Sequence, residues 1–196
     1  IIFSNLHDNE ISELTRVRTL ASVPFGCRYR LIDFPLSNMV NSNISNINVI
    51  TQYNYHSLMD HVGTGKDWDL ARRESGITFV SPFQSANAEG KMFATHMEAL
   101  KSMKEYIDEI KEEYVVLMDS DVALTIDVSD VIHTHEQTGC DVTIVTSDVE
   151  SEYTAKHPRI MISSVAGKVT QIAMSASYDE RHPELALGIY VMKTQH

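Results

Sequence analysis

The segment VPFGCRYRLIDFPLSNMVNS, which runs from Val23 to Ser42, decides the fold class. It begins with a glycine-bearing turn, continues through an Arg-x-Arg pair and a short apolar run, and ends in residues rich in asparagine. Turn and helix propensities do not require this particular order, because many sequences satisfy them equally well. We therefore interpret the segment as the mark of a protein family.

The sequence around this segment alternates between strand and helix patterns. Short apolar runs predict strands over 47–51, 77–80, 114–118, 141–146 and 187–192. Apolar residues at steps of three and four predict helices over 10–18, 34–39, 94–113 and 128–137. A hairpin is expected over 159–172, turning at Ala166-Gly167. Strands that alternate with helices indicate an α/β domain with a mostly parallel central sheet.

Length and composition indicate one globular domain. The chain has 196 residues, of which 43% are hydrophobic and 22% are charged, and this is enough to bury a single core. No apolar run approaches the roughly 20 residues that span a bilayer, and Ile1-Ile2-Phe3 passes at once into polar residues, so we expect no membrane partner and no signal peptide. The expected location is cytoplasmic. The net charge of −11 argues against a nucleic-acid partner, which needs clustered lysine and arginine.

The cysteines and the paired histidines predict no metal centre. Cys27 and Cys140 are far apart in sequence and have no ligand at zinc spacing, so we expect both to be reduced and structural. His133 and His135 fall in the predicted helix 128–137, where we expect them to be solvated.

The segment Val23–Ser42 resembles the part of ADP-glucose pyrophosphorylase (glucose-1-phosphate adenylyltransferase) that follows the phosphate-binding loop. Further resemblances lie at Thr51–Leu58, Asp60–Leu70 and Leu187–Met192. Together they extend over Ile1–Met192 and imply a Rossmann-like, three-layer nucleotide-diphospho-sugar transferase domain over residues 1–196. In that family the chain continues past this point, within the same domain and then into a left-handed β-helix domain used in tetramer formation.

The loop before this segment departs from the family pattern. The family has a Gly-Gly-x-Gly-Thr-Arg loop whose backbone amides cradle the triphosphate, whereas Asn5–Glu10 contains no glycine. Glu10 replaces the phosphate-facing arginine, and Leu20 stands at the position of the catalytic lysine. Carboxylates at Asp8 and Glu10 would repel a triphosphate by on the order of several kcal/mol. The resemblance therefore implies that this chain has no catalytic residue of its own and binds ATP or sugar phosphate weakly at most.

The positions that contact the sugar nucleotide in the family are also changed. By the same resemblance, Phe93 replaces a tyrosine that contacts the nucleotide sugar, Arg159 replaces a glycine, and Ala186 replaces a serine that contacts the sugar. Met174-Ser175 stands near the place of a Glu-Lys pair that holds the sugar phosphate. These changes predict a degenerate substrate site.

One acidic motif of the family is kept. The buried strand predicted at 114–118 ends in Asp119-Ser120-Asp121, and open α/β sheets bind ligands at the carboxyl ends of their strands. Two carboxylates at this spacing can share a divalent metal, and the resemblance matches Asp121 to the family's Mg2+-binding aspartate. The alternative is that Asp121 caps the turn into the following helix, which begins near Asp127.

Three functions remain open from the sequence. Arg18–Gly26 and Ser57–Leu70 resemble a second, catalytically degenerate subunit that some bacteria carry, so the first is a regulatory subunit in glycogen synthesis whose partner is a catalytic paralogue in a hetero-oligomer. The second is an active enzyme that joins ATP and glucose 1-phosphate with Mg2+ on Asp121. The third is a metal-dependent glycosyltransferase of related fold, with Asp119-x-Asp121 as its metal motif.

Overall fold

One mixed sheet organises the chain, which we describe from a computed structural model over residues 1–71, 75–81, 92–148, 159–174 and 184–194. Its eight strands are β1 (Ile2–Phe3), β4 (Asn46–Ile50), β5 (Gly76–Val80), β6 (Tyr114–Asp119), β7 (Val142–Asp148), β8 (Ile160–Val165), β9 (Lys168–Met174) and β10 (Glu184–Lys193). Strands β2 (Pro24–Phe25) and β3 (Tyr29–Arg30) form a separate small hairpin. The α/β class and every strand predicted from the apolar runs are confirmed.

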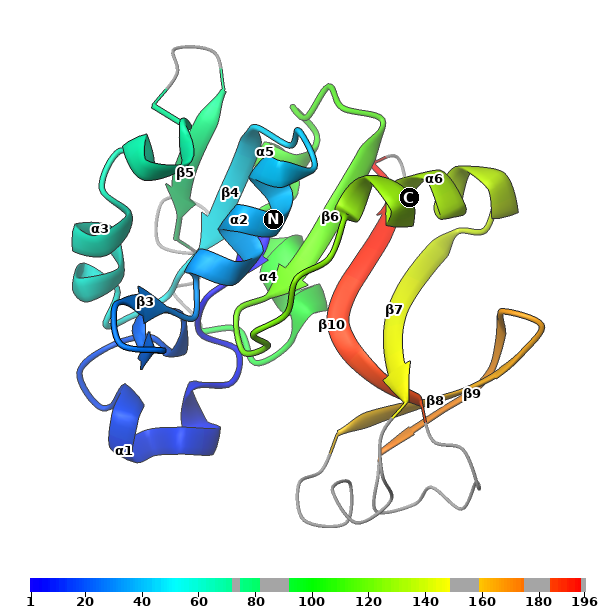
Figure 1. The fold of residues 1–196 in the computed structure, drawn as a ribbon, viewed down its shortest axis with the longest axis horizontal. Coiled ribbons are helices and arrows are strands. Elements are labelled where there is room, and N and C mark those ends of the chain that lie inside the picture. The colour runs from blue at the N-terminus through cyan, green and yellow to red at the C-terminus, as the bar shows by residue number, and fades with distance from the viewer. Residues whose placement is uncertain (72–74, 82–91, 149–158, 175–183, 195–196) are drawn as a thin grey trace.

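The sheet has a parallel part and an antiparallel part (Figure 1). Strands β5, β4, β1 and β6 lie side by side in that order and pair in parallel. Strand β10 then pairs antiparallel with β6 on one edge and with β7 on the other, and it also pairs with β8. Strands β8 and β9 form the predicted hairpin, whose turn includes Ala166 and Gly167. The parallel strands therefore end together at one edge of the sheet.

Helices cover both faces of the parallel part, which confirms the three-layer arrangement. The helices are α1 (Ser12–Thr15), α2 (Asp33–Asn41), α3 (His56–Val62), α4 (His96–Ser102), α5 (Lys104–Ile107) and α6 (Val128–Thr138), with short 3-10 turns at Asp8–Ile11, Leu20–Ser22 and Lys66–Trp68. On one face, Ile2 of β1 packs in a core with residues of α2, α3 and α6. On the other face, Phe3 packs with residues of α4. Neighbouring strand residues point to opposite faces, so both faces of β1 are buried.

The prediction of one helix over 94–113 is wrong. Helix α4 ends at Ser102, α5 ends at Ile107, and 108–113 form a connection to β6. The backbone carbonyls of Glu112 and Glu113 accept hydrogen bonds from the hydroxyl and the amide of Thr194. These carbonyls thus extend the pairing between β6 and β10. The residues of 108–113 have the apolar and charged spacing of a helix, but their backbone is not helical.

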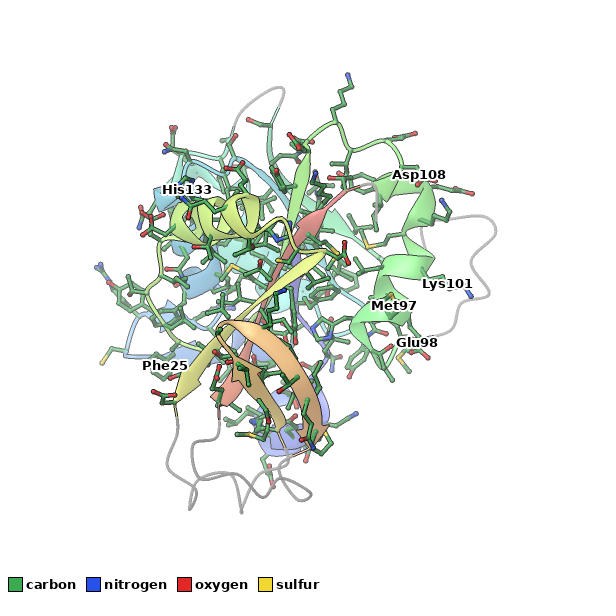
Figure 2. The ribbon with its side chains drawn as sticks, turned by 90° about the vertical axis from the view of Figure 1, so that its right-hand side faces the viewer. Phe25, Met97, Glu98, Lys101, Asp108 and His133 are labelled. Carbon is green, nitrogen blue, oxygen red and sulfur yellow. The ribbon has the colours of Figure 1, made fainter. Side chains whose placement is uncertain are left out.

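The expectations for the histidines and cysteines hold only in part. His133 lies on the outer face of α6, as expected (Figure 2). His135 is buried instead, because α6 places it one helical turn below Ile132 on the side that faces the sheet, and its Nδ1 lies 2.8 Å from Thr143 Oγ1. Both cysteines are free but exposed, so neither belongs to the core. None of the helices in the described part of the chain is both long and apolar enough to cross a lipid bilayer.

Candidate functional site

The candidate site forms where β1 and β6 end side by side. These strands are parallel neighbours with Phe3 opposite Asp119, so the loops that follow them leave the sheet at the same edge. The Ser120 hydroxyl donates a 2.8 Å hydrogen bond to the Phe3 carbonyl and ties the two strand ends together. The loop after β1 thereby brings His7 over the Asp119-Ser120-Asp121 motif.

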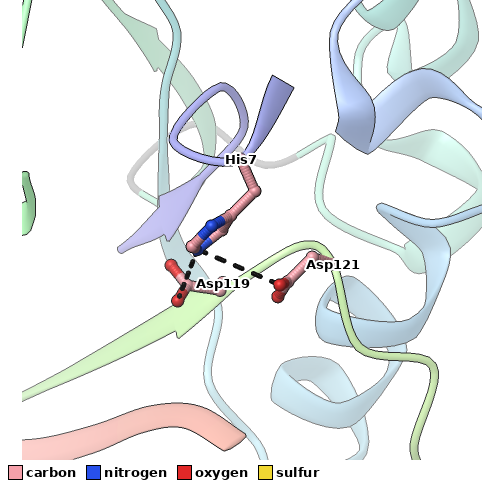
Figure 3. Close-up of side chains that lie close together, drawn as sticks. All are labelled: His7, Asp119 and Asp121. Carbon is pink, nitrogen blue, oxygen red and sulfur yellow. Dashed lines mark ion pairs between the residues drawn. The ribbon is translucent and has the colours of Figure 1, made fainter. Parts of the chain in front are cut away.

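His7 faces both carboxylates of that motif (Figure 3). Its Nε2 lies 3.5 Å from Asp119 Oδ2 and 3.9 Å from Asp121 Oδ2. The other ring nitrogen, Nδ1, lies 3.0 Å from Glu10 Oε1. A ligand atom from each of His7, Asp119 and Asp121 falls within 4.8 Å of the others, which is close enough to hold one metal ion. Sequence analysis missed His7 because only the pairing of β1 with β6 brings it to the motif.

Asp119 is held from two further sides. His96, at the start of α4, donates from Nε2 to Asp119 Oδ1 over 2.7 Å. Gly188 of β10 lies against the other side with φ of +68°, and a Cβ there would come within 2.9 Å of Asp119 Cβ and Cγ. The Asp119 side chain is 6% exposed, so its carboxylate has one fixed orientation, with Oδ2 toward His7.

Burial and neighbouring charges shift the pKa values of the three residues in this cluster. The Asp119 carboxylate 3.5 Å away, followed by the charge of Asp121, raises the pKa of His7 to about 9, although burial opposes this shift. Burial alone would raise the pKa of Asp119, but its contacts with His7 and His96 outweigh burial, and its pKa lies below the usual value. Burial raises the pKa of Asp121. Without a metal, His7 is therefore an imidazolium at neutral pH between two carboxylates.

A cavity of about 430 Å³ opens beside the cluster. Its lining includes six residues that the sequence analysis singled out, while Ser175 lies outside the described residues; the six are Glu10, Asp119, Asp121, Arg159, Met174 and Ala186. Arg159 reaches across the rim, where its Nη1 lies 2.8 Å from Glu10 Oε2. An ion pair thus joins Arg159 in the cavity lining to Glu10 of the loop after β1.

Two other predicted positions lie away from this cavity. Phe93 is buried in the core formed with α4, and its backbone amide and carbonyl bond to the side-chain amide of Gln52. Leu20 is buried in a small cluster with Val23 and Leu31. Neither side chain is among the described residues that line the cavity. The structure also assigns the cap of α6 to Asp127, whose carboxylate accepts from the Ser129 amide over 2.9 Å, so the capping alternative for Asp121 is wrong.

The Asn5–Glu10 loop is closed by its own side chains. The Asp8 carboxylate is buried and accepts hydrogen bonds from Asn5 Nδ2 at 2.7 Å and from the Leu20 amide at 2.8 Å. Burial raises the pKa of Asp8 more than these bonds lower it. The Asn5 side-chain oxygen in turn accepts from the Gln52 amide at 2.8 Å. A buried carboxylate therefore holds the loop closed through the Asn5 side chain and the Leu20 amide.

These features suit a cation better than a polyphosphate. The carboxylates of Asp119 and Asp121 and the imidazole of His7 offer ligands to a metal ion, and Glu10 adds a third carboxylate to the lining of the same cavity. Comparison with known protein families gives a direct match: residues 10–172 match the family model of the nucleotidyl transferases. The chain belongs to this family. This agrees with the resemblance drawn from Val23–Ser42 and with the arrangement of the sheet.

Relatives of the chain include a glycogen biosynthesis protein and a glucose-1-phosphate adenylyltransferase. It is 36% identical to the glycogen biosynthesis protein GlgD of Bacillus subtilis, over 77% of this chain and 43% of that protein. It is 33% identical to the glucose-1-phosphate adenylyltransferase of Thermotoga neapolitana, over 97% of this chain and 44% of that protein. The chain thus spans less than half the length of these curated relatives.

A solved structure confirms the fold. The crystal structure of a putative glucose-1-phosphate thymidylyltransferase from Bacillus anthracis, in complex with a sucrose, matches with a TM-score of 0.74. The match extends over 99% of this chain and 70% of that one, at 13% identity. At this identity the likeness concerns the Rossmann-like fold alone.

Proposed function

We propose that this chain is a non-catalytic, regulatory part of a glucose-1-phosphate adenylyltransferase assembly in glycogen biosynthesis. Its partner is a catalytic paralogue in a cytoplasmic hetero-oligomer, in which the paralogue converts ATP and glucose 1-phosphate to ADP-glucose and pyrophosphate. The similarity to the glycogen biosynthesis protein of Bacillus subtilis supports this proposal. Framework residues match the family in Val23–Ser42, while the loop Asn5–Glu10 does not.

One observation carries the proposal: the buried Asp8 carboxylate lies within the loop that would cradle phosphates and accepts hydrogen bonds from the Asn5 side chain in the loop and from the Leu20 amide beyond it. A triphosphate would have to displace this carboxylate from the Leu20 amide and would then lie beside Glu10. Like charges at contact distance in a partly desolvated site oppose binding by on the order of several kcal/mol. Leu20 offers no charge to a transferring phosphoryl group either. The chain therefore keeps the scaffold and binds nucleotide weakly.

The test is a steady-state assay of pyrophosphate release. We expect none from this protein alone with ATP, glucose 1-phosphate and Mg2+, and a changed rate or changed effector response when it is mixed with an active paralogue. The paralogue mixed with an unrelated protein of similar size is the control. Pyrophosphate release by this protein alone, abolished by Asp121→Asn, would overturn the proposal.

The second candidate is an active adenylyltransferase with Mg2+ on Asp121, which the similarity to the Thermotoga neapolitana enzyme favours. Mg2+ takes oxygen ligands in octahedral geometry, and Asp119 and Asp121 provide them. The imidazole of His7 does not fit this ion, because nitrogen ligands suit softer metals. The donor set as a whole thus disagrees with Mg2+, and we derive no catalytic step through it. Transfer of sugar from a nucleotide sugar to an acceptor, measured in a separate assay, would instead support the glycosyltransferase alternative.

A further inference from the structure

We propose that His7, Asp119 and Asp121 form a site for a divalent transition-metal ion of the Zn2+ class, which accepts imidazole nitrogen, and not for Mg2+. The distances fit this assignment. The separations of 3.5 and 3.9 Å between His7 Nε2 and the two carboxylate oxygens exceed ordinary hydrogen-bond lengths. Two ligands on one tetrahedral ion, with bonds of about 2.0–2.1 Å, lie about 3.3 Å apart.

The surroundings of His7 are those of a metal ligand. A histidine that binds metal through one ring nitrogen usually donates its other N–H to a carboxylate, which fixes the ring and its tautomer. His7 directs Nε2 to the two aspartates and has Nδ1 3.0 Å from Glu10 Oε1. Arg159 in turn lies 2.8 Å from the other oxygen of Glu10. Glu10, which stands where the resemblance places a phosphate-facing arginine, therefore orients a metal-binding imidazole.

Asp119 is oriented in the same way. His96 donates to Oδ1 over 2.7 Å, which leaves Oδ2 directed toward His7. The backbone of Gly188 closes the other side of Asp119. All three proposed ligands also line the 430 Å³ cavity, so a fourth coordination position faces an open space that water or a small anion can enter.

The experiment measures metal binding and does not depend on the regulatory proposal. The whole protein is stripped of metal and titrated with Zn2+, Co2+ and Mg2+ by calorimetry at about pH 8, because metal binding must displace protons from its ligands and is favoured at alkaline pH. We expect saturable binding of one Zn2+ or Co2+, visible absorption bands of Co2+ with nitrogen in its coordination shell, and no comparable binding of Mg2+. Absence of Zn2+ binding, or equal binding of Mg2+, would overturn the assignment.

Matched variants separate this site from adventitious binding. His7→Gln should weaken Zn2+ binding by at least about 100-fold, and Glu10→Gln by about 10–100-fold with a shifted Co2+ spectrum. The controls are His133→Gln and Glu136→Gln, which alter an exposed histidine–carboxylate pair on α6 and should change neither measurement. If His7→Gln fails to fold by circular dichroism, Asp121→Asn and Glu10→Gln decide the question. Zn2+ affinity that is the same in the folded site variants and the wild-type protein would refute the proposal.

Discussion

Gly188 is the residue at which a single methyl group should disturb both the fold and the site. It has φ of +68°, and a Cβ there would come within 2.9 Å of Asp119 Cβ and Cγ and closer still to Oδ2. Left-handed backbone costs an L-residue about 1–2 kcal/mol. Asp119 cannot move away without straining the 2.7 Å bond to His96, and overpacking of this kind costs about 1–3 kcal/mol more. We therefore expect Gly188→Ala to lower the free energy of unfolding by about 2–5 kcal/mol.

The assay is urea denaturation followed by circular dichroism, and Gly167→Ala is the matched control. Gly167 also has positive φ, at +75°, but a Cβ there meets nothing within 4 Å. Its replacement should cost only the backbone strain of about 1–2 kcal/mol. The difference between the two variants isolates the contact with Asp119. Equal losses of stability in both variants would refute the reasoning that β10 presses against this carboxylate.

Three further predictions concern charge, packing and thiol reactivity. In metal-free protein, folding raises the pKa of His7 from 6.5 to about 9. Protonated His7 should therefore stabilise the fold by on the order of 3 kcal/mol below about pH 6.5, and this stabilisation should be lost as pH rises through about 9. The difference in unfolding free energy between wild type and His7→Gln should shrink over that range, and a constant difference would contradict this prediction. Leu36→Ala removes a fully buried side chain and should cost about 2–5 kcal/mol in urea denaturation, so a loss below about 1 kcal/mol would contradict its core position. Hydrogen bonds from Thr138 and Thr143 lower the pKa of the Cys140 thiol. Thr143→Val removes one of these bonds, so less of the thiol should be ionised at about pH 8 and its alkylation by iodoacetamide should be slower, with Cys27 as the internal reference.

The strands could be predicted because their sequences are short stretches rich in apolar and β-branched residues. Ile47–Ile50 and Val115–Met118 have nearly no polar residues, as expected for strands buried on both faces. The helix predicted over 94–113 was wrong because helical spacing persists in 108–113 while the backbone there pairs with Thr194. A local pattern does not contain that long-range contact.

The site could be predicted only for residues carried by a motif. Asp119 and Asp121 come directly after a predicted strand, and Arg159 stands out as a departure from the family sequence. All three residues line the cavity. His7 and His96 were missed because they approach Asp119 from different elements, the loop after β1 and the start of α4. Knowledge that β1 pairs with β6 would have indicated His7, since the two strand ends then lie side by side. For His96, the sequence offers no comparable signal.

The position of β10 in the sheet sets an order for folding during synthesis. This strand comes last among the described strands and yet lies between β6 and β7. A nascent chain that has emerged only through β6 can already join β5, β4, β1 and β6, but β7 must wait for residues 184–193 to leave the ribosome. Until then its backbone amides and carbonyls lack the pairing of the finished sheet. The interval before β10 arrives is therefore when this chain is most exposed to wrong strand pairing, and when a chaperone would have most to protect.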